Sequence, residues 1–125
     1  MSLIGTGIDI VEVERIERLL VRQKQKFLKR VFTNAEADYC MKRGKPAIHL
    51  AARFAAKEAA AKALGTGFAK GVRMRDIEVI AAGKGPPCIK LHGAAAKKYD
   101  SLGAKQILLS ISHTSEHALA HVDIS

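Results

Sequence analysis

The chain has 125 residues, with 21 Lys or Arg against 12 Asp or Glu and a formal net charge of +9, so we expect anionic partners and substrates. Hydrophobic residues make up 48% of the sequence and there is no Trp, which indicates one modest core built from aliphatic side chains. Cys40 and Cys88 lie far apart without a CxxC spacing, which argues against a zinc site or a disulfide framework and favours a reducing cytoplasm.

The N-terminal segment is apolar, but it predicts a strand and not a membrane span or a secretion signal. Residues 3–11 (LIGTGIDIV) are rich in β-branched side chains and indicate a buried strand that ends near Asp9. Gly5 and Gly7 would allow another backbone to approach this strand closely. Asp9 and Glu12 interrupt the apolar run, and no other run reaches the length that a bilayer requires.

A basic helix is expected after this strand. From Val13 onward apolar residues recur at helical spacing, while Arg15, Arg18 and Arg22 stand at i, i+3 and i+7 and define a basic stripe. The tract at residues 22–30 either continues the helix or breaks into a second one. The stripe is either a solvated cationic face or a docking surface for an acidic partner.

Two further helices are predicted in the middle of the chain. Thr33 and Glu36 have the spacing of a capping box, so a short helix should begin near Asn34 and stop at Gly44, which can serve as its left-handed terminus. The stretch at 46–64 is rich in Ala, begins with Pro and is followed by Gly65, and it is the strongest helix prediction in the sequence.

The C-terminal half predicts two antiparallel pairs of strands and one helix. Residues 66–75 form a loop, and DIEVIAA at 76–82 pairs with CIKLH at 88–92 across a Gly/Pro-rich turn. A helix follows at about 93–102, and the runs at 105–113 and 117–124 form a closing hairpin. No linker or repeat divides residues 1–125, so we expect a single α+β domain with helices packed on a small antiparallel sheet.

Three residues on two predicted elements could hold a metal ion and phosphate groups. Glu58 and Lys62 lie four apart on the Ala-rich helix and share a face, although they could equally form an ordinary ion pair. Asp9 lies between two isoleucines, where a carboxylate must be paired, hydrogen-bonded or metal-bound, and a turn role is an equal alternative. Magnesium typically uses one or two carboxylates with phosphates and water, so Asp9 and Glu58 would suffice.

A second candidate set could bind phosphate. Arg53 and Lys57 belong to the charged edge predicted for the Ala-rich helix, and His113 and Thr114 end the predicted strand ILLSISH. A lone histidine at a strand end is more often structural than functional. An imidazole and a hydroxyl beside Arg53 would nevertheless make a phosphate pocket in so basic a protein. Neither a P-loop nor a Ser/His/Asp triad spacing is present.

Four segments carry a resemblance to a known family: GIDIVEVERIER at 7–18, FTNAEADYC at 32–40, RFAAKEAAAKALGTG at 53–67 and SISHT at 110–114. Together they resemble the holo-[acyl-carrier-protein] synthases, the short-chain group of 4'-phosphopantetheinyl transferases. The resemblance implies the phosphopantetheinyl transferase fold. It also implies an enzyme that moves 4'-phosphopantetheine from coenzyme A to a serine of apo acyl carrier protein for fatty acid biosynthesis, releasing adenosine 3',5'-bisphosphate.

The resemblance further implies residue roles. Asp9 and Glu58 match the magnesium carboxylates of the family, Lys62 matches the lysine that contacts the diphosphate, and these three are the expected catalytic residues. The positions that the family places around coenzyme A are Arg53, Lys62, His113 and Thr114, all but Lys62 near the ribose phosphate.

The expected partners follow from the same resemblance. The first helix of the family docks the acidic helix of acyl carrier protein, which implies contacts with Arg15, Arg18 and Arg22. Family members form trimers with active sites between subunits, so we expect a homotrimer.

Larger relatives carry another acidic metal ligand two residues after the aspartate that corresponds to Asp9. Here Val11 stands in that position, so water should complete the metal shell, and the general base stays open.

Two alternative functions remain at this point. The same transfer could serve carrier domains of polyketide or peptide synthetases, and nothing in the sequence separates these carriers. A nucleic-acid-binding module would also suit the +9 charge. The chain lacks the aromatic platform and the helix-turn-helix signature of such modules, so we expect neither nucleic acid nor membrane as a partner.

Overall fold

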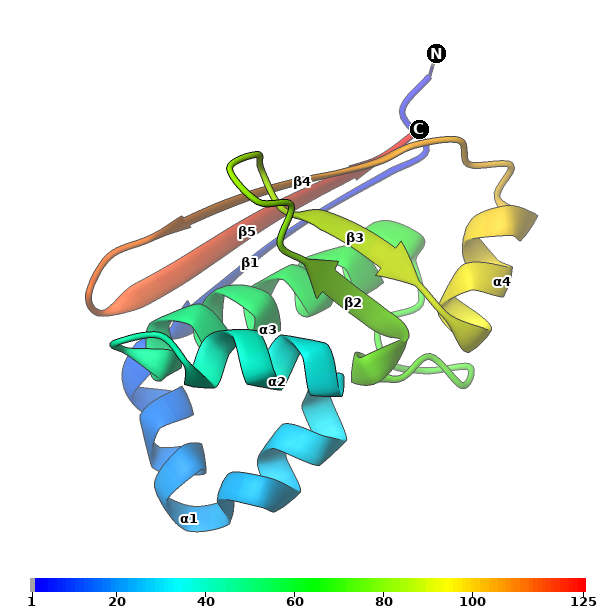
Figure 1. Ribbon diagram of the computed structural model, residues 1–125. Coiled ribbons are helices and arrows are strands. Elements are labelled where there is room, and N and C mark those ends of the chain that lie inside the picture. The colour runs from blue at the N-terminus through cyan, green and yellow to red at the C-terminus, as the bar shows by residue number, and fades with distance from the viewer. Residues whose placement is uncertain (1) are drawn as a thin grey trace.

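Helices and antiparallel strands make up the computed structural model, which describes residues 2–125 (Figure 1). The strands are β1 (Gly5–Glu12), β2 (Ile77–Ile80), β3 (Cys88–Leu91), β4 (Ile107–His113) and β5 (His117–Ile124). The helices are α1 (Val13–Val31), α2 (Asn34–Met41), α3 (Pro46–Leu64) and α4 (Gly93–Ser101), and a single 3-10 turn, η1 (Met74–Asp76), precedes β2. The predicted α+β class is confirmed.

The strands divide into two sheets, where the sequence had suggested one. One sheet has the order β1-β5-β4, so that the N-terminal strand pairs with the C-terminal hairpin. The other contains only the predicted hairpin of β2 and β3. Both sheets are antiparallel, and α3 packs along the larger one (Figure 1).

The close packing of α3 on β1 depends on two glycines. A Cβ atom at Gly5 would overlap the carbonyl oxygen of Ala63, and one at Gly7 would overlap that of Ala59. Any side chain at either position would therefore push the helix away from the sheet. The predicted close approach is confirmed, and so is the helix end at Gly65, which is left-handed with a φ of 81°.

The prediction of a fully buried strand that ends near Asp9 is wrong. β1 continues to Glu12, and its side chains alternate between the two faces of the sheet. Asp9 points to the α3 side, whereas Ile8 and Ile10 are 57% and 60% exposed on the outer face. Leu108 of β4 is exposed on the same outer face. The apolar residues that suggested burial thus form an open surface.

The ends and bends of α1 and α2 refine the prediction. α1 runs to Val31 but is kinked at Gln23. The basic tract at 22–30 therefore continues the helix, as one alternative predicted, but with a break in its course, as the other did. The capping box of Thr33 and Glu36 is present at the start of α2. α2 ends at Met41 and not at Gly44, because the chain turns there with right-handed backbone angles. Within residues 2–125 no helix is both long and apolar enough to cross a membrane.

Lys57 is a core residue and not part of a polar edge. Its Nζ atom is fully buried and donates to Glu36 Oε1 at 2.7 Å and to the carbonyls of Met74 and Ile77 at 3.0 and 2.6 Å. Burial lowers the pKa of Lys57, and the Glu36 carboxylate opposes that shift. Glu36 also accepts from the backbone N–H of Val79 at 2.9 Å, so this ion pair joins α2, α3 and β2.

Candidate functional site

Lys62 pairs with the strand carboxylate and not with Glu58. Its Nζ atom lies 3.1 Å from Asp9 Oδ1 and donates to the carbonyl of Ile8 at 3.0 Å. Both contacts cross from the C-terminal half of α3 to β1. The lysine side chain is 52% exposed, so it remains accessible to a ligand in solvent.

Glu58 lies next to Asp9 and is partly buried. Burial raises the pKa of Glu58, the neighbouring Asp9 carboxylate raises it further, and Lys62 and Arg15 act in the opposite direction. Two neighbouring carboxylates repel each other, and a cation bound between them would stabilise both negative charges. No cluster of three or more His, Cys, Asp or Glu side chains suitable for a metal occurs within residues 2–125. A pair of carboxylates fits the chemistry of magnesium, which takes its remaining ligands from phosphates and water.

A basic groove leads to Glu58. This cavity of about 360 Å³ lies between α1 and α3, and the three arginines of the predicted stripe line it. Arg15 stacks over the Phe54 ring at 5.2 Å, and Arg18 pairs with Glu14 at 3.2 Å. The sequence did not single out the other lining residues, which are Leu19, Phe27, Arg30, Val31, Phe54 and Met74. In the sequence, the apolar residues of this groove could not be distinguished from ordinary core residues.

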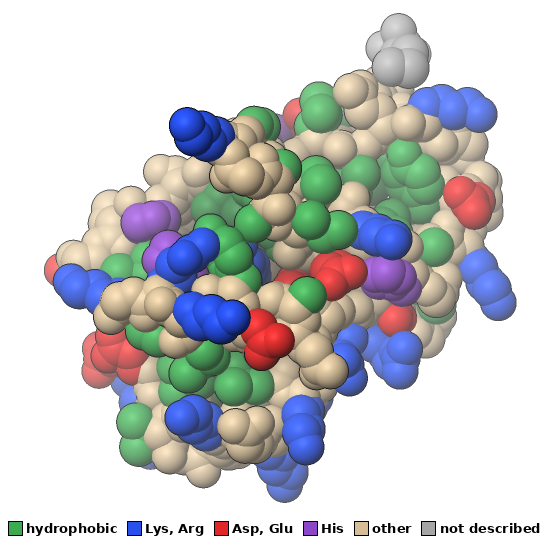
Figure 2. Space-filling view, in the orientation of Figure 1, with side chains coloured by type: hydrophobic (Ala, Val, Ile, Leu, Met, Phe, Trp, Pro, Cys, Tyr) green, Lys and Arg blue, Asp and Glu red, His purple; other side chains and the backbone are tan. Residues whose placement is uncertain are grey.

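Arg53 belongs to a second cluster. The side chain is buried, with the residue only 6% exposed, and its Nε atom has no hydrogen-bond partner. Its guanidinium lies 4.4 Å from the centroid of the Tyr39 ring. His49 lies between this pair and His113, with ring centroids 6.5 Å from Tyr39 and 6.2 Å from His113. Figure 2 shows His and Lys or Arg side chains gathered near α2 and the β4–β5 hairpin.

Thr114, a predicted ligand contact, has a structural task in the turn after β4. Its Oγ1 atom accepts from the backbone N–H groups of Glu116 and His117 at 3.2 and 3.1 Å, which closes the β4–β5 turn. The hydroxyl proton stays free to be donated to a ligand. The exposed position of Thr114 beside His113 is compatible with such a contact.

The comparisons with known proteins identify the family. The model of the 4'-phosphopantetheinyl transferase superfamily matches residues 5–122, which is nearly the whole chain. The chain belongs to the 4'-phosphopantetheinyl transferase superfamily. This transferase is 47% identical over 120 residues to the holo-[acyl-carrier-protein] synthase of Solibacter usitatus, covering 96% of each chain.

Solved structures give the same result for this phosphopantetheinyl transferase. Holo-[acyl-carrier-protein] synthase from Neisseria meningitidis has 38% identity and a TM-score of 0.88, with 99% of both chains covered. The Helicobacter pylori synthase, solved in complex with coenzyme A, has 36% identity and a TM-score of 0.84, covering 96% of this chain and 99% of its own. The predicted family and fold are confirmed.

The predicted site residues of this transferase form two clusters within one chain. Asp9 and His113 stand on β1 and β4, the opposite edges of a sheet with β5 between them, which separates their backbones by about 10 Å. Arg53 precedes Glu58 by five residues, which turns the two side chains about 140° apart around the helix. One cluster holds Asp9, Glu58 and Lys62, and the other holds Arg53 and His113.

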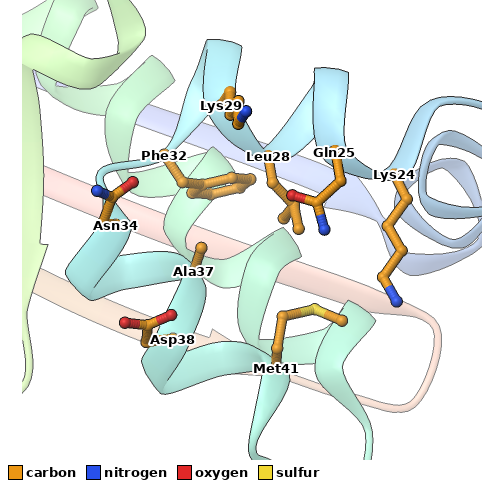
Figure 3. Close-up of a pocket in the computed structure, with 9 residues that line it drawn as sticks. All are labelled: Lys24, Gln25, Leu28, Lys29, Phe32, Asn34, Ala37, Asp38 and Met41. Atoms are coloured by element: carbon orange, nitrogen blue, oxygen red, sulfur yellow. The ribbon is translucent and has the colours of Figure 1, made fainter.

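A further cavity of about 470 Å³ contains none of the predicted residues. It lies between the second half of α1 and α2, with Leu28, Phe32 and Met41 at its apolar wall and Lys24 and Asp38 nearer its rim (Figure 3). The residues predicted from the sequence therefore lie apart from this cavity.

Proposed function

We propose that this chain is a holo-[acyl-carrier-protein] synthase. It transfers 4'-phosphopantetheine from coenzyme A to a serine of apo acyl carrier protein and releases adenosine 3',5'-bisphosphate. The observation that carries the proposal is the convergence of Asp9, Glu58 and Lys62 at the end of an arginine-lined groove. Carboxylates for a cation, a lysine for the diphosphate and a basic channel for an acidic protein are what this transfer requires.

The chemistry follows from the placement of these three side chains. The serine oxygen attacks the phosphorus that carries pantetheine, forming one P–O bond while the P–O bond to adenosine bisphosphate breaks. Lys62 donates to the diphosphate and stabilises the charge that develops on the leaving oxygen. The serine proton passes to Glu58 or to a neighbouring water. Magnesium held by Asp9 and Glu58 would supply charge neutralisation at the diphosphate oxygens.

The arginine stripe is proposed to dock the carrier protein. Arg15→Ala and Arg22→Ala should each raise the KM for the carrier roughly two- to fivefold while leaving the KM for coenzyme A unchanged, since exposed charges contribute about 1 kcal/mol or less. Arg18→Ala should have the smallest effect, because Arg18 already pairs with Glu14. Steady-state kinetics at low and high salt measures this, with exposed Lys97→Ala of α4 as the control. Equal carrier KM values for the stripe and control variants would contradict the docking role.

We propose a homotrimer in which each active site combines the two clusters from different subunits. The separation of the clusters supports this, and so does the exposed apolar face formed by Ile8, Ile10 and Leu108. Ile10→Glu should yield monomers in light scattering, because it would bury a charge in the interface. Val21→Glu, on an exposed residue of α1, should leave the trimer intact. A trimeric Ile10→Glu variant would exclude this interface.

The carrier and the compartment complete the proposal. We assign the fatty acid carrier as the partner and the cytoplasm as the location, in agreement with the two free thiols, Cys40 and Cys88. Incubation with coenzyme A, magnesium and apo carriers of fatty acid, polyketide and peptide systems, followed by intact mass spectrometry, tests the choice. Modification of only the synthetase carriers would favour the alternative partner. Tight polynucleotide binding without any transfer would favour a nucleic-acid-binding module.

A further inference from the structure

Thr6, His121 and Asp123 form a hydrogen-bonded cluster on the larger sheet. His121 Nε2 lies 3.0 Å from Thr6 Oγ1 and 3.2 Å from Asp123 Oδ1, and the Thr6 hydroxyl donates to the same carboxylate oxygen at 2.8 Å. The histidine and the aspartate stand on β5, between the edge strands β1 and β4. None of the three residues belongs to the candidate transferase site.

The alternation of β5 places the His121–Asp123 pair on the outer face of the sheet. The other set of side chains on this strand is fully buried on the α3 side: Ala118, Ala120, Val122 and Ile124. His121 and Asp123 alternate with them and therefore point away from α3. His121 lies opposite Ile8 of β1, and Asp123 lies opposite Leu108 of β4. Any partner that covers both of these exposed apolar residues must also cover the pair between them.

A second copy of the chain is the partner that suits this face. The two clusters of candidate site residues lie apart on one chain, so a complete site requires a neighbouring chain. Ile8, Ile10 and Leu108 are each more than half exposed, and covering them would remove apolar surface from water. The polar pair suits the same partner, because each copy brings both an acid and a base to the contact.

Coverage by another copy makes the charge of the pair important. While the imidazole is protonated, His121 and Asp123 form an ion pair with no net charge. Loss of that proton leaves the Asp123 carboxylate charged inside the interface without a counter-ion, which is strongly unfavourable. Histidine is the side chain that ordinarily gains or loses its proton between about pH 5 and pH 8. Association should therefore be strongest at acidic pH and weaken as the pH rises through this range.

The neighbours of the pair on the sheet do not replace the imidazolium as a counter-ion. Within residues 2–125, Asp123 forms an ion pair with His121 alone. Glu12 and His117 face each other four residues along β5, about 13 Å from His121, and Lys105 precedes β4 at the other end of the sheet. The residues opposite the pair on the two edge strands are uncharged: Thr6, Ile8, Leu108 and Ser110.

We propose that the His121–Asp123 pair is a pH-sensitive element of the subunit interface, which strengthens the association of copies of this chain when His121 is protonated. The inference rests on the proposed homotrimer. The pair provides no group to the transfer reaction, so it acts on the chemistry only through assembly.

A dilution series in mass photometry and analytical ultracentrifugation tests the inference at about pH 6 and about pH 8. The dissociation constant of the wild-type assembly should rise about tenfold or more between these values. Asp123→Asn keeps the shape of the side chain but removes its charge, so protonation of His121 would then bury an unpaired cation. Its assembly should weaken toward acidic pH, opposite to the wild type. The net charge of +9 acts on both proteins almost equally, so the opposite signs are specific to the pair.

Two histidine variants complete the comparison. His121→Gln removes the titrating group and should reduce the change in dissociation constant between the two pH values to less than about twofold. His92→Gln removes a histidine that lies 2.9 Å from Glu78 of the smaller sheet, and it should retain the wild-type change. Equal wild-type dissociation constants at both pH values, or the same sign of change in the wild type and Asp123→Asn, would overturn the inference and leave the homotrimer in place. Wild-type protein that stays monomeric at every pH would instead refute the proposed homotrimer.

Discussion

Replacement of Asp9 by Asn or of Glu58 by Gln is expected to lower kcat by about 100- to 1,000-fold. Each change keeps the shape of the side chain but removes one of the two negative charges proposed to hold magnesium. Asp9→Asn removes the carboxylate that pairs with the Lys62 ammonium. Glu58→Gln removes the second carboxylate proposed to hold the metal. The remaining carboxylate alone would bind the cation weakly.

The folded structure should survive these changes. Asp9 and Lys62 are 20% and 52% exposed, and partly exposed pairs of this kind contribute about 1 kcal/mol or less. Circular dichroism and urea unfolding should therefore match the wild type within that range. Asp100→Asn removes an exposed carboxylate on α4 and should leave kcat unchanged. Wild-type turnover in Asp9→Asn or Glu58→Gln would remove the metal assignment.

The second large effect concerns stability. Lys57→Met should lower the free energy of unfolding by about 3–5 kcal/mol, because it leaves the Glu36 carboxylate buried without its cation. The change also deprives the carbonyls of Met74 and Ile77 of a donor. Domains of this size are stable by about 5–15 kcal/mol, so the variant would lose a large part of its stability. Urea unfolding measures the change directly.

Two comparisons make the stability prediction specific. Arg18→Met breaks the exposed pair with Glu14 and should cost less than about 1 kcal/mol. In the double variant Lys57→Met with Glu36→Gln, the free energy lost should be smaller than the sum of the two single losses, because the unpaired charge is gone. An Lys57→Met protein as stable as Arg18→Met would show that the buried pair contributes little.

Local signals in the sequence were sufficient for most of the elements. The Ala-rich helix, its Pro46 start and its Gly65 end follow from short-range chemistry, and the structure has all three. The exposure of Ile8 and Ile10 could not be predicted in this way, because a run of apolar residues does not show which face of a strand another chain or a helix covers. The same reasoning placed Lys57 on the charged edge of its helix, since its acidic partner is 21 residues away in the sequence.

Local signals in the sequence also described the candidate site only in part. Glu58 and Lys62 were recognised as neighbours from helical spacing, but the structure pairs Lys62 with Asp9, which is 53 residues away. Residue chemistry suggested Arg53 and His113 as a phosphate pocket and the family resemblance agreed, but their surroundings are built from α2, α3 and β4. Tyr39 lies in the segment 32–40 that carries the resemblance, but no role was predicted for it, and His49 was not singled out. The packing of α2 against α3 brings Tyr39 to Arg53, whereas His49 stands one helical turn before Arg53 on α3 itself.

Transfer to a carrier protein is the central claim, and one reaction tests it. Wild-type protein, coenzyme A, magnesium and apo acyl carrier protein are incubated, and the carrier mass and the released nucleotide are measured in the same sample. We expect a carrier heavier by one phosphopantetheine, an equal amount of adenosine 3',5'-bisphosphate, and neither product with Glu58→Gln at matched times. An unchanged carrier mass with every carrier tried would contradict it.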